Sequence, residues 1–138
     1  MPPGFSSLAI ADGLVFTIVA RGEECSKKIE TCVALDADTG NVLRAAPLGV
    51  SDYGHDGGNT GTPGNRGSDD PRSTPASDGE RVFVYDSHML LGCFDAASGN
   101  VIWKHDIVEE FSGREIKWLN ASSPLLVGNV VYVGGGND

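Results

Sequence analysis

An internal repeat constrains the fold of this chain more than any other feature of its sequence. Residues 35–48 and residues 94–107 align over fourteen positions without a gap. Both segments contain Asp-Ala-x-(Thr/Ser)-Gly-Asn-Val, followed by an apolar residue. Self-similarity of this kind is the sequence signature of repeat architectures, so it bears on the whole fold before any local pattern does.

A second repeated element precedes each copy of the first. It occupies residues 7–16 and 74–83, and it occurs a third time at residues 123–132. In the first two occurrences the dipeptide Asp-Gly lies just before an apolar run. This dipeptide favours a tight turn, because glycine tolerates positive φ and the aspartate side chain can bond the nearby backbone. The order along the chain is therefore element, copy, element, copy, element.

Each complete unit is predicted to form four antiparallel strands. After a short first strand, the predicted strands are residues 14–20, 32–35 and 42–48 in one unit and residues 81–86, 90–94 and 101–107 in the next. The apolar runs show little alternation, as expected for strands covered on both faces. The 19 glycines fit a chain with many tight turns. The predicted fold class is all-β, with β-propeller blades of four antiparallel strands, about two and a half blades, hence a partial propeller.

The repeat also predicts where the blades begin and end. We expect blade 1 at about 6–48, a Gly-rich inter-blade insert at 49–71, blade 2 at about 72–108, and the start of blade 3 at about 120–138. The step from Asp36 to Asp95 is 59 residues, longer than the roughly 40–50 of a propeller blade, and the insert accounts for most of the excess. Such inserts often carry binding surfaces.

The repeat resembles that of the pyrroloquinoline-quinone (PQQ) β-propeller superfamily. The motif Ala-x-Asp-x-x-Thr-Gly-x-x-x-Trp appears here with Arg44 in place of the Trp in blade 1. In blade 2, Cys93 and Ser98 replace the Ala and the Thr, and Trp103 keeps the last position. Residues 71–83 are also similar to the bacterial PQQ-like group related to the propeller lipoprotein of the outer-membrane barrel assembly machinery. In that family the Trp packs between adjacent blades, which implies the same place for Arg44 and Trp103.

The resemblance implies a scaffold more directly than an activity, since the motif consists of turn and packing residues. We favour a noncatalytic β-propeller scaffold or protein-interaction module of the bacterial PQQ-like type. Its expected partners are other blades of the same propeller or other proteins, with self-association through open blade faces. The alternative is a segment of a PQQ- and Ca²⁺-dependent quinoprotein dehydrogenase, acting on alcohols or sugars, whose cofactor ligands lie outside this chain. The resemblance implies the periplasm or cell envelope, although residues 1–5 do not read as a signal peptide.

No catalytic residue and no cofactor-binding residue is assigned from the sequence. Quinoprotein dehydrogenases hold PQQ against Ca²⁺ with carboxylate and amide oxygens, usually beside a disulfide between neighbouring cysteines. This sequence contains no Cys-Cys pair, no Cys-x-x-Cys-His haem motif and no Gly-x-Ser-x-Gly nucleophile elbow. We therefore expect no cofactor, and PQQ with Ca²⁺ only under the alternative.

The insert contains three weak candidates for metal ligands, Asp52, His55 and Asp56. Oxygen ligands on a Gly-rich loop could hold Ca²⁺, and the imidazole with both carboxylates could hold a transition metal. The sequence lacks EF-hand and His-x-x-x-His spacing. The favoured interpretation is therefore a solvated loop without metal.

The remaining histidines and the cysteines are given structural interpretations. His88 lies in a predicted hairpin and His105 on an outer strand, and both are expected to be surface or packing residues. Cys25 and Cys32 flank a predicted hairpin loop at residues 26–30, so they form either a disulfide or two free thiols. Cys93 lies in an apolar strand and is expected to be buried.

The net charge and the hydropathy exclude two classes of partner. The chain carries 19 acidic and 10 basic residues, a net charge of −9, with no stripe of Lys and Arg. Such a surface repels phosphate backbones, so nucleic acid is not expected as a partner. No apolar stretch approaches the ~20 residues of a membrane helix, so no membrane span is expected.

Overall fold

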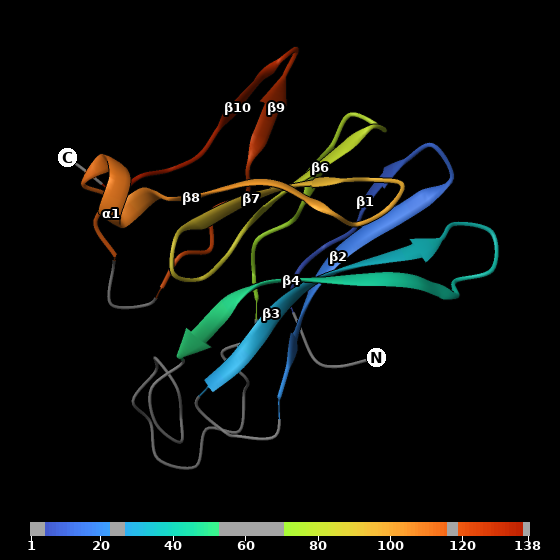
Figure 1. Cartoon of the computed structure of the whole chain (residues 1–138), viewed down its shortest axis with the longest axis horizontal. Coiled ribbons are helices and arrows are strands. Elements are labelled where there is room, and N and C mark those ends of the chain that lie inside the picture. Colours follow the sequence, from blue (N-terminus) through green and yellow to red (C-terminus); the bar gives the residue numbers. More distant parts are fainter. Residues whose placement is uncertain (1–4, 23–26, 53–70, 116–118, 137–138) are drawn as a thin grey trace.

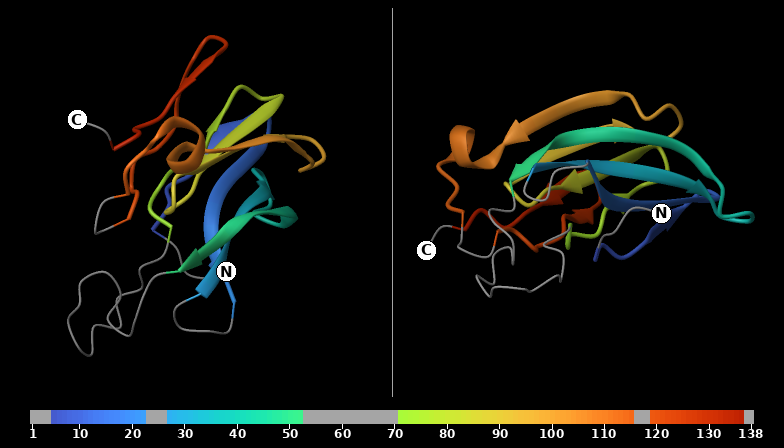
Figure 2. Two further views of the ribbon diagram at one scale, coloured as in Figure 1. Left: turned by 60° about the vertical axis from the view of Figure 1, so that its left-hand side comes forward. Right: turned by 90° about the horizontal axis from the view of Figure 1, so that it is seen from below.

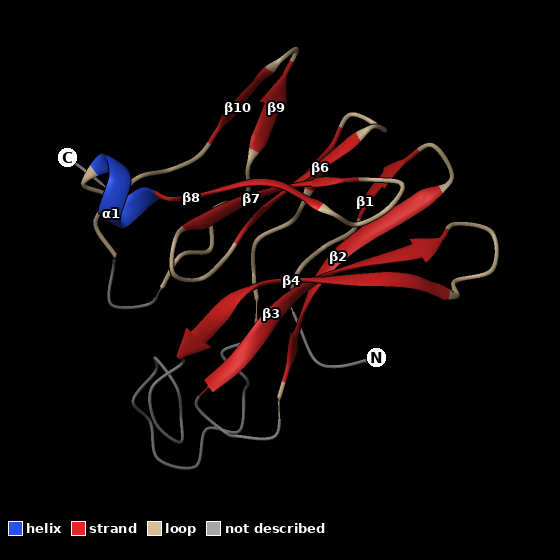
Figure 3. Ribbon diagram, viewed as in Figure 1, coloured by secondary structure: helices blue, strands red, loops and turns tan. Residues whose placement is uncertain are grey.

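The structure, a computed structural model, describes residues 5–22, 27–52, 71–115 and 119–136. These residues form two four-stranded antiparallel sheets, a two-stranded hairpin and a single-turn helix (Figure 1). Strands dominate the secondary structure, as Figure 3 shows. The predicted all-β fold of four-stranded propeller blades is confirmed.

Blade 1 contains the strands β1 (Ala9–Ala11), β2 (Leu14–Arg21), β3 (Lys27–Asp36) and β4 (Val42–Asp52). Each strand pairs antiparallel with the next one in the chain, so the sheet order is β1-β2-β3-β4. This meander is the arrangement that tight Asp-Gly and Thr-Gly turns produce between successive strands.

Blade 2 repeats this order with β5 (Ala76–Ser77), β6 (Arg81–Tyr85), β7 (Leu90–Asp95) and β8 (Val101–Asp106). The hairpin of β9 (Leu125–Val127) and β10 (Val130–Tyr132) follows. The strand register is the same in all three units. The equivalent pairs are Ala9 with Phe16, Ala76 with Phe83, and Leu125 with Tyr132. Both complete blades also have a register shift at the same position between their third and fourth strands.

The hairpin between β3 and β4 is longer than the sequence analysis predicted. Residues 27–30, which were predicted to lie in a hairpin loop, belong to β3 and pair with residues 49–52 of β4. The last four residues of β4 therefore form strand where the sequence predicted the start of the insert. The two deviations have one cause, because each segment supplies the hydrogen-bonding partner of the other.

Blade 2 ends in a helix that begins at Ile107, the last residue of the predicted strand 101–107. β8 stops at Asp106, and α1 (Ile107–Phe111) follows at once. The Asp106 carboxylate accepts a 3.0 Å hydrogen bond from the backbone N–H of Glu109 and so caps the helix. A local side-chain bond of this kind ends a strand that periodicity alone would extend.

The predicted turn chemistry of the repeat motif is confirmed in both blades. Asp36 Oδ1 accepts hydrogen bonds from Thr39 N at 2.8 Å and Thr39 Oγ1 at 2.6 Å. Asp95 Oδ1 does the same with Ser98, at 2.6 Å for both donors. Gly40 follows with φ of 71°, a conformation that glycine adopts without strain. The pKa values of both carboxyl groups are lowered, first by the side-chain hydrogen bond and then by the backbone one.

The two four-stranded sheets lie face to face (Figure 2). Apolar side chains are buried between them. One buried cluster joins blade 1 to blade 2. Its members include Phe16, Ile18, Leu48, Val82, Val84 and Phe94. A second cluster, centred on Tyr85, joins blade 2 to α1 and to residues 131 and 133. Blade 2 therefore lies between blade 1 and the β9–β10 hairpin.

Cys32 and Cys93 are free, buried thiols, and Cys32 belongs to the cluster that joins the two blades. Burial raises the pKa of the Cys32 thiol to about 12 and also raises that of Cys93, so both behave as small apolar side chains. Burial of Cys93 was predicted. Of the pair considered for a disulfide, Cys25 lies outside the described residues.

The two ends of the blades differ in what they carry. At one end lie the Asp-Gly and Thr-Gly turns, which we call the turn end (Figure 1). At the other end, which we call the loop end, lie the termini of β4 and β8, the start of β3 and the turn between β6 and β7. The strand ends there are joined by connections longer than the tight turns of the other end, so the loop end is the natural place to look for a site.

Candidate functional site at the loop end

A cluster of buried and half-buried polar side chains joins the two blades at the loop end. We call it the loop-end cluster, and it consists of Glu30, Ser51, Asp86, Ser87 and His88. The first two come from β3 and β4 of blade 1, and the other three from the β6–β7 turn of blade 2. The cluster therefore forms only where the two blades meet.

Glu30 is the most deeply buried charged residue of the cluster, with a relative exposure of 0%. It shares a face of β3 with Cys32, because side chains alternate along a strand, and so it points toward blade 2. Ser51 Oγ donates a 2.9 Å hydrogen bond to Glu30 Oε1, and the backbone N–H of Ser87 donates one of 3.3 Å to Oε2. Ser87 Oγ in turn bonds Ser51 Oγ at 2.9 Å. One carboxylate thus binds donors from both blades.

Asp86 is the second buried carboxyl group, with a relative exposure of 2%. Its Oδ1 accepts hydrogen bonds from the backbone N–H groups of His88 at 2.9 Å and Leu90 at 2.7 Å, which shape the β6–β7 turn. Burial raises the pKa of Asp86 to about 7, and the nearby charge of Glu30 adds to the rise. Its Oδ2 would lie 3.0 Å from a Cβ placed on Gly49 of blade 1. Glycine there lets the carboxyl group approach the β4 backbone.

His88 connects the cluster to two further segments. Its Nε2 lies 3.1 Å from the backbone N of Asp52 and 3.2 Å from the Asp52 carbonyl oxygen, at the end of β4. Its Nδ1 lies 2.7 Å from Glu115 Oε1, in the segment after α1. Burial by itself would lower the pKa of His88, but the hydrogen bond and charge of Glu115 outweigh it and raise the pKa.

Two more polar contacts strengthen the same junction. Lys104 of β8 donates hydrogen bonds from Nζ to the carbonyl oxygens of Pro47, at 3.1 Å, and Leu48, on β4 of blade 1. Asn120 donates from Nδ2 to the Asp86 carbonyl oxygen at 2.9 Å, and its backbone N–H bonds the Ser87 carbonyl oxygen. The β6–β7 turn is thereby tied to blade 1 and to the segment that leads into β9.

The loop-end cluster can link the two blades through hydrogen bonds. Its carboxyl groups accept hydrogen bonds from protein donors, and its two hydroxyl groups bond each other and Glu30. Within the described ranges, the two histidine rings bond carboxylates and backbone, and neither bonds a serine hydroxyl as a nucleophile's base would. Nor do three His, Cys, Asp or Glu side chains converge there in a way that could hold a metal ion.

The structure places the residues predicted as weak metal candidates as follows. Asp52 is the last residue of β4, and its backbone groups contact the His88 ring. His55 and Asp56 lie outside the described residues. His88 and His105 lie where the sequence predicted them, in a hairpin turn and on an outer strand. His105 pairs with Glu110 at 2.7 Å.

Sequence reasoning missed Glu30, Ser51, Asp86 and Ser87. Glu30 was placed in a loop, although it continues the alternating pattern of Cys32 and Ala34 on the same strand face. Asp86 follows the apolar run of β6 directly, as a turn aspartate often does. These were the available signals, but neither shows that the two carboxyl groups meet across a blade junction.

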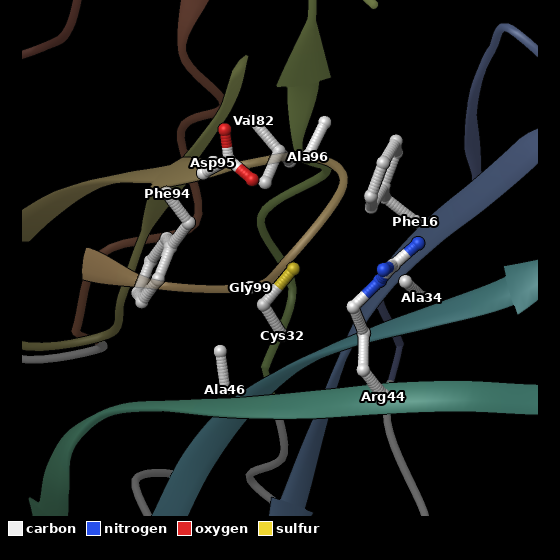
Figure 4. A pocket seen from close by; sticks show the side chains of 10 residues that line it. All are labelled: Phe16, Cys32, Ala34, Arg44, Ala46, Val82, Phe94, Asp95, Ala96 and Gly99. Carbon is white, nitrogen blue, oxygen red and sulfur yellow. The ribbon is translucent and has the colours of Figure 1, made fainter. Parts of the chain in front are cut away.

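A small cavity lies at the same blade junction, nearer the turn end (Figure 4). Arg44 extends from β4 along it, among Phe16, Ala34 and the Asp95–Gly99 turn of blade 2. The Nε of Arg44 is buried and makes no hydrogen bond with any described residue. Arg44 pairs with Ala34 just as Trp103 pairs with Cys93, so both stand in the inter-blade position that the family resemblance implied.

Comparison with known proteins identifies a family model that matches most of the chain. Residues 28–138, more than half of the chain, match the family model described as outer membrane protein assembly factor BamB. No curated protein matches the chain. No helix in the described part of the chain has the length and apolar character needed to cross a membrane.

Proposed function

We propose the role of a noncatalytic scaffold and protein-interaction module for this chain, which belongs to the PQQ-repeat β-propeller family of the outer membrane protein assembly factor BamB. The observation that carries the proposal is the hydrogen bonding of Glu30. Its two carboxylate oxygens bind donors of both blades, and the carboxylate is fully buried. A group held in this way stabilises a junction and is not available to a substrate.

The proposal includes the absence of quinone binding by this chain. A PQQ site requires carboxylate and amide oxygens free to bind Ca²⁺, whereas the loop-end carboxyl groups face donors within the protein. The two free cysteines of the described part, Cys32 and Cys93, lie on β3 of blade 1 and β7 of blade 2. They therefore do not provide a pair of neighbouring cysteines.

Isothermal titration calorimetry with PQQ and CaCl₂ tests this part of the proposal. We expect no saturable heat at micromolar protein and ligand. Saturable binding in the micromolar range would overturn the noncatalytic assignment. The Asp86→Asn variant serves as the matched control, since loss of that binding in the variant would place the quinone at the loop end.

The interaction role is supported by the surface of the described residues. Large apolar side chains are exposed over both outer faces of the blade stack, on β1 and on β9–β10. Exposed apolar patches of this kind mark sites of protein contact. The partners proposed here are other blades of the same type or other proteins, as the family name suggests for an assembly factor.

The family also suggests a place in the cell, and we propose the periplasmic side of a bacterial envelope. Fractionation of an epitope-tagged gene product, expressed at its natural length, tests this directly. Release with the periplasmic fraction on osmotic shock, or recovery with outer membranes, is expected. Recovery in the cytoplasmic fraction would contradict it.

A further inference from the structure

We propose that the loop-end cluster is a pH-sensitive switch between a closed and an open junction of blades 1 and 2. While the Asp86 carboxyl group holds a proton, the β6–β7 turn stays packed against the ends of β3 and β4. When that proton leaves, two buried carboxylates from neighbouring blades carry charge within one cluster, and the turn separates from blade 1. Both sides of the switch lie within complete blades of this chain.

The two carboxyl groups are brought together by the packing of one blade on the other. Glu30 of β3 is 0% exposed and Asp86 of the β6–β7 turn is 2% exposed. Ser87, the neighbour of Asp86, donates its backbone N–H to Glu30 Oε2 at 3.3 Å. The segment that carries one carboxyl group therefore also binds the other. Two negative charges in this buried place repel each other, and separation of the turn from blade 1 relieves the repulsion.

The geometry of Asp86 places its proton at the contact between the blades. Oδ1 already accepts hydrogen bonds from the backbone N–H groups of His88 at 2.9 Å and Leu90 at 2.7 Å. The proton therefore resides on Oδ2, which would lie 3.0 Å from a Cβ placed on Gly49 of β4. Loss of the proton puts a negative charge against the blade 1 backbone at the point of closest approach, which is costly in a buried place.

Other charged groups around the switch act in both directions. Taken element by element, the titratable side chains nearby are Glu30, Asp52, Tyr85, His88, Lys104 and Glu115. The cations His88 and Lys104 favour an ionised Asp86, but Glu115 lies 2.7 Å from the His88 ring and carbonyl oxygens of β4 bind Lys104 Nζ. Burial and the charge of Glu30 outweigh them and raise the pKa of Asp86 to about 7. The switch therefore operates near neutral pH.

The opening is expected to stay local. The rest of the junction is held by the buried apolar cluster that includes Phe16, Val82 and Phe94, none of which titrates. The two N–H bonds to Asp86 Oδ1 are formed equally well with an ionised carboxylate, so the turn keeps its shape and moves as one unit. Local openings of this kind cost less free energy than global unfolding.

Native-state hydrogen exchange of the full chain, followed by NMR, tests the proposal. The Ser87 N–H reports the junction, because its acceptor belongs to blade 1. The Cys93 N–H reports global unfolding, because Cys93 is buried in β7 between two paired strands. At pH 7, Ser87 should exchange faster than Cys93 and respond little to low urea. After correction for the intrinsic rate, its protection should fall by up to about tenfold per pH unit between about pH 5 and 7 and then level off.

Two variants identify the group that titrates. Asp86→Asn should make the protection of Ser87 independent of pH over this range. Asp36→Asn is the matched control, since Asp36 is a hydrogen-bonded carboxyl group at the turn end and should keep the wild-type profile. A Ser87 N–H that exchanges only together with Cys93 at every urea concentration and pH would overturn the proposal. An Asp86→Asn variant with the wild-type pH profile would overturn it as well.

A carbon-13 NMR titration of the Asp86 carboxyl group gives a check that requires no variant to fold. We expect a midpoint near 7 in the wild type, as the pKa of Asp86 indicates. A midpoint near the ordinary value of 3.8 would contradict the switch. Glu30→Gln should move the midpoint to lower pH, because it removes the nearby negative charge. Failure of the switch would leave the calorimetric test with PQQ, and with it the noncatalytic assignment, unaffected.

Discussion

The hydroxyl oxygens of Ser51 and Ser87 lie 2.9 Å apart and join the last strand of blade 1 to a turn of blade 2. Both side chains are buried, and Ser51 also donates to Glu30. If the blades separated, Ser51 would keep Glu30, but Ser87 would lose both of its partners in blade 1 until water replaced them, so the contact favours a closed junction. Polar contacts at the loop end thus act together with the apolar packing between the blades.

The stability of the chain should fall as the pH rises from about 5 to 8. The pKa of Asp86 is about 7 in the folded chain against 3.8 as a model value. Between these values the folded state holds a proton that the unfolded state has released, so the stabilisation is lost as pH rises through about 7. The raised pKa of His88 acts in the same direction. Urea denaturation at several pH values measures the effect, which for Asp86 is at most on the order of 4 kcal/mol.

The Asp86→Asn variant separates the contribution of this carboxyl group. An amide oxygen still accepts the N–H bonds of residues 88 and 90 but does not titrate. The pH dependence between 5 and 8 should become clearly smaller in the variant. A variant with the same pH dependence as the wild type would show that Asp86 titrates normally.

Replacing Arg44 by the tryptophan of the repeat should stabilise the chain. The Nε of Arg44 is buried at the blade 1–blade 2 junction and makes no hydrogen bond with a described residue. Tryptophan replaces a charged guanidinium group by a larger, mostly apolar ring that adds contact between the blades, so we expect Arg44→Trp to gain about 1 kcal/mol and a higher melting temperature. Leu43→Trp, at the half-exposed neighbouring position, should change stability little. An unchanged or lower melting temperature for Arg44→Trp would count against this placement.

Gly49→Ala should destabilise the blade junction. A Cβ at this position would lie 3.0 Å from both Asp86 Oδ2 and Leu90 Cδ2, so these two buried or half-buried side chains of blade 2 would have to move aside. We expect a loss of about 1–3 kcal/mol in chemical denaturation. Gly135→Ala is the matched control, because the nearest atom to its added Cβ is 3.9 Å away. Equal effects of the two substitutions would mean that the close approach at Gly49 does not matter.

The repeat allowed much of the fold to be predicted from the sequence. Turns such as Asp36-to-Gly40 are local, because the side chain and the backbone groups that it binds lie within a few residues. The copy at Asp95 then repeats the same bonds, and the two copies reinforce each other. The position of Arg44 between blades also followed from the motif that it interrupts.

The loop-end cluster could not be predicted in the same way. Glu30 and Ser87 are 57 positions apart in the chain and meet only through the packing of one blade on another. The extension of β3 to Lys27 was missed for a related reason. The β4 residues that pair with this extension include Gly49 and Asp52, and both are residue types that are common in loops. Pairing across a hairpin overrides local preference there.

Glu30→Ala should destabilise the chain more than Glu30→Gln. The alanine leaves the hydroxyl of Ser51 and the N–H of Ser87 without their acceptor in a buried place. The expected loss is about 1–3 kcal/mol in the unfolding free energy. Glutamine keeps one acceptor oxygen, so it should recover part of the loss. If alanine and glutamine were equally tolerated, the hydrogen bonds of Glu30 would contribute nothing to stability.

The most direct test of the account is a double-mutant cycle between Ser51 and Ser87, measured by chemical denaturation. Ser51→Ala, Ser87→Ala and the double variant together isolate the interaction across the blade junction from other effects of each change. If the loop-end cluster holds the two blades together, the interaction energy should be about 0.5–2 kcal/mol in favour of the wild-type pair. An interaction energy indistinguishable from zero would contradict the structural role given to this cluster.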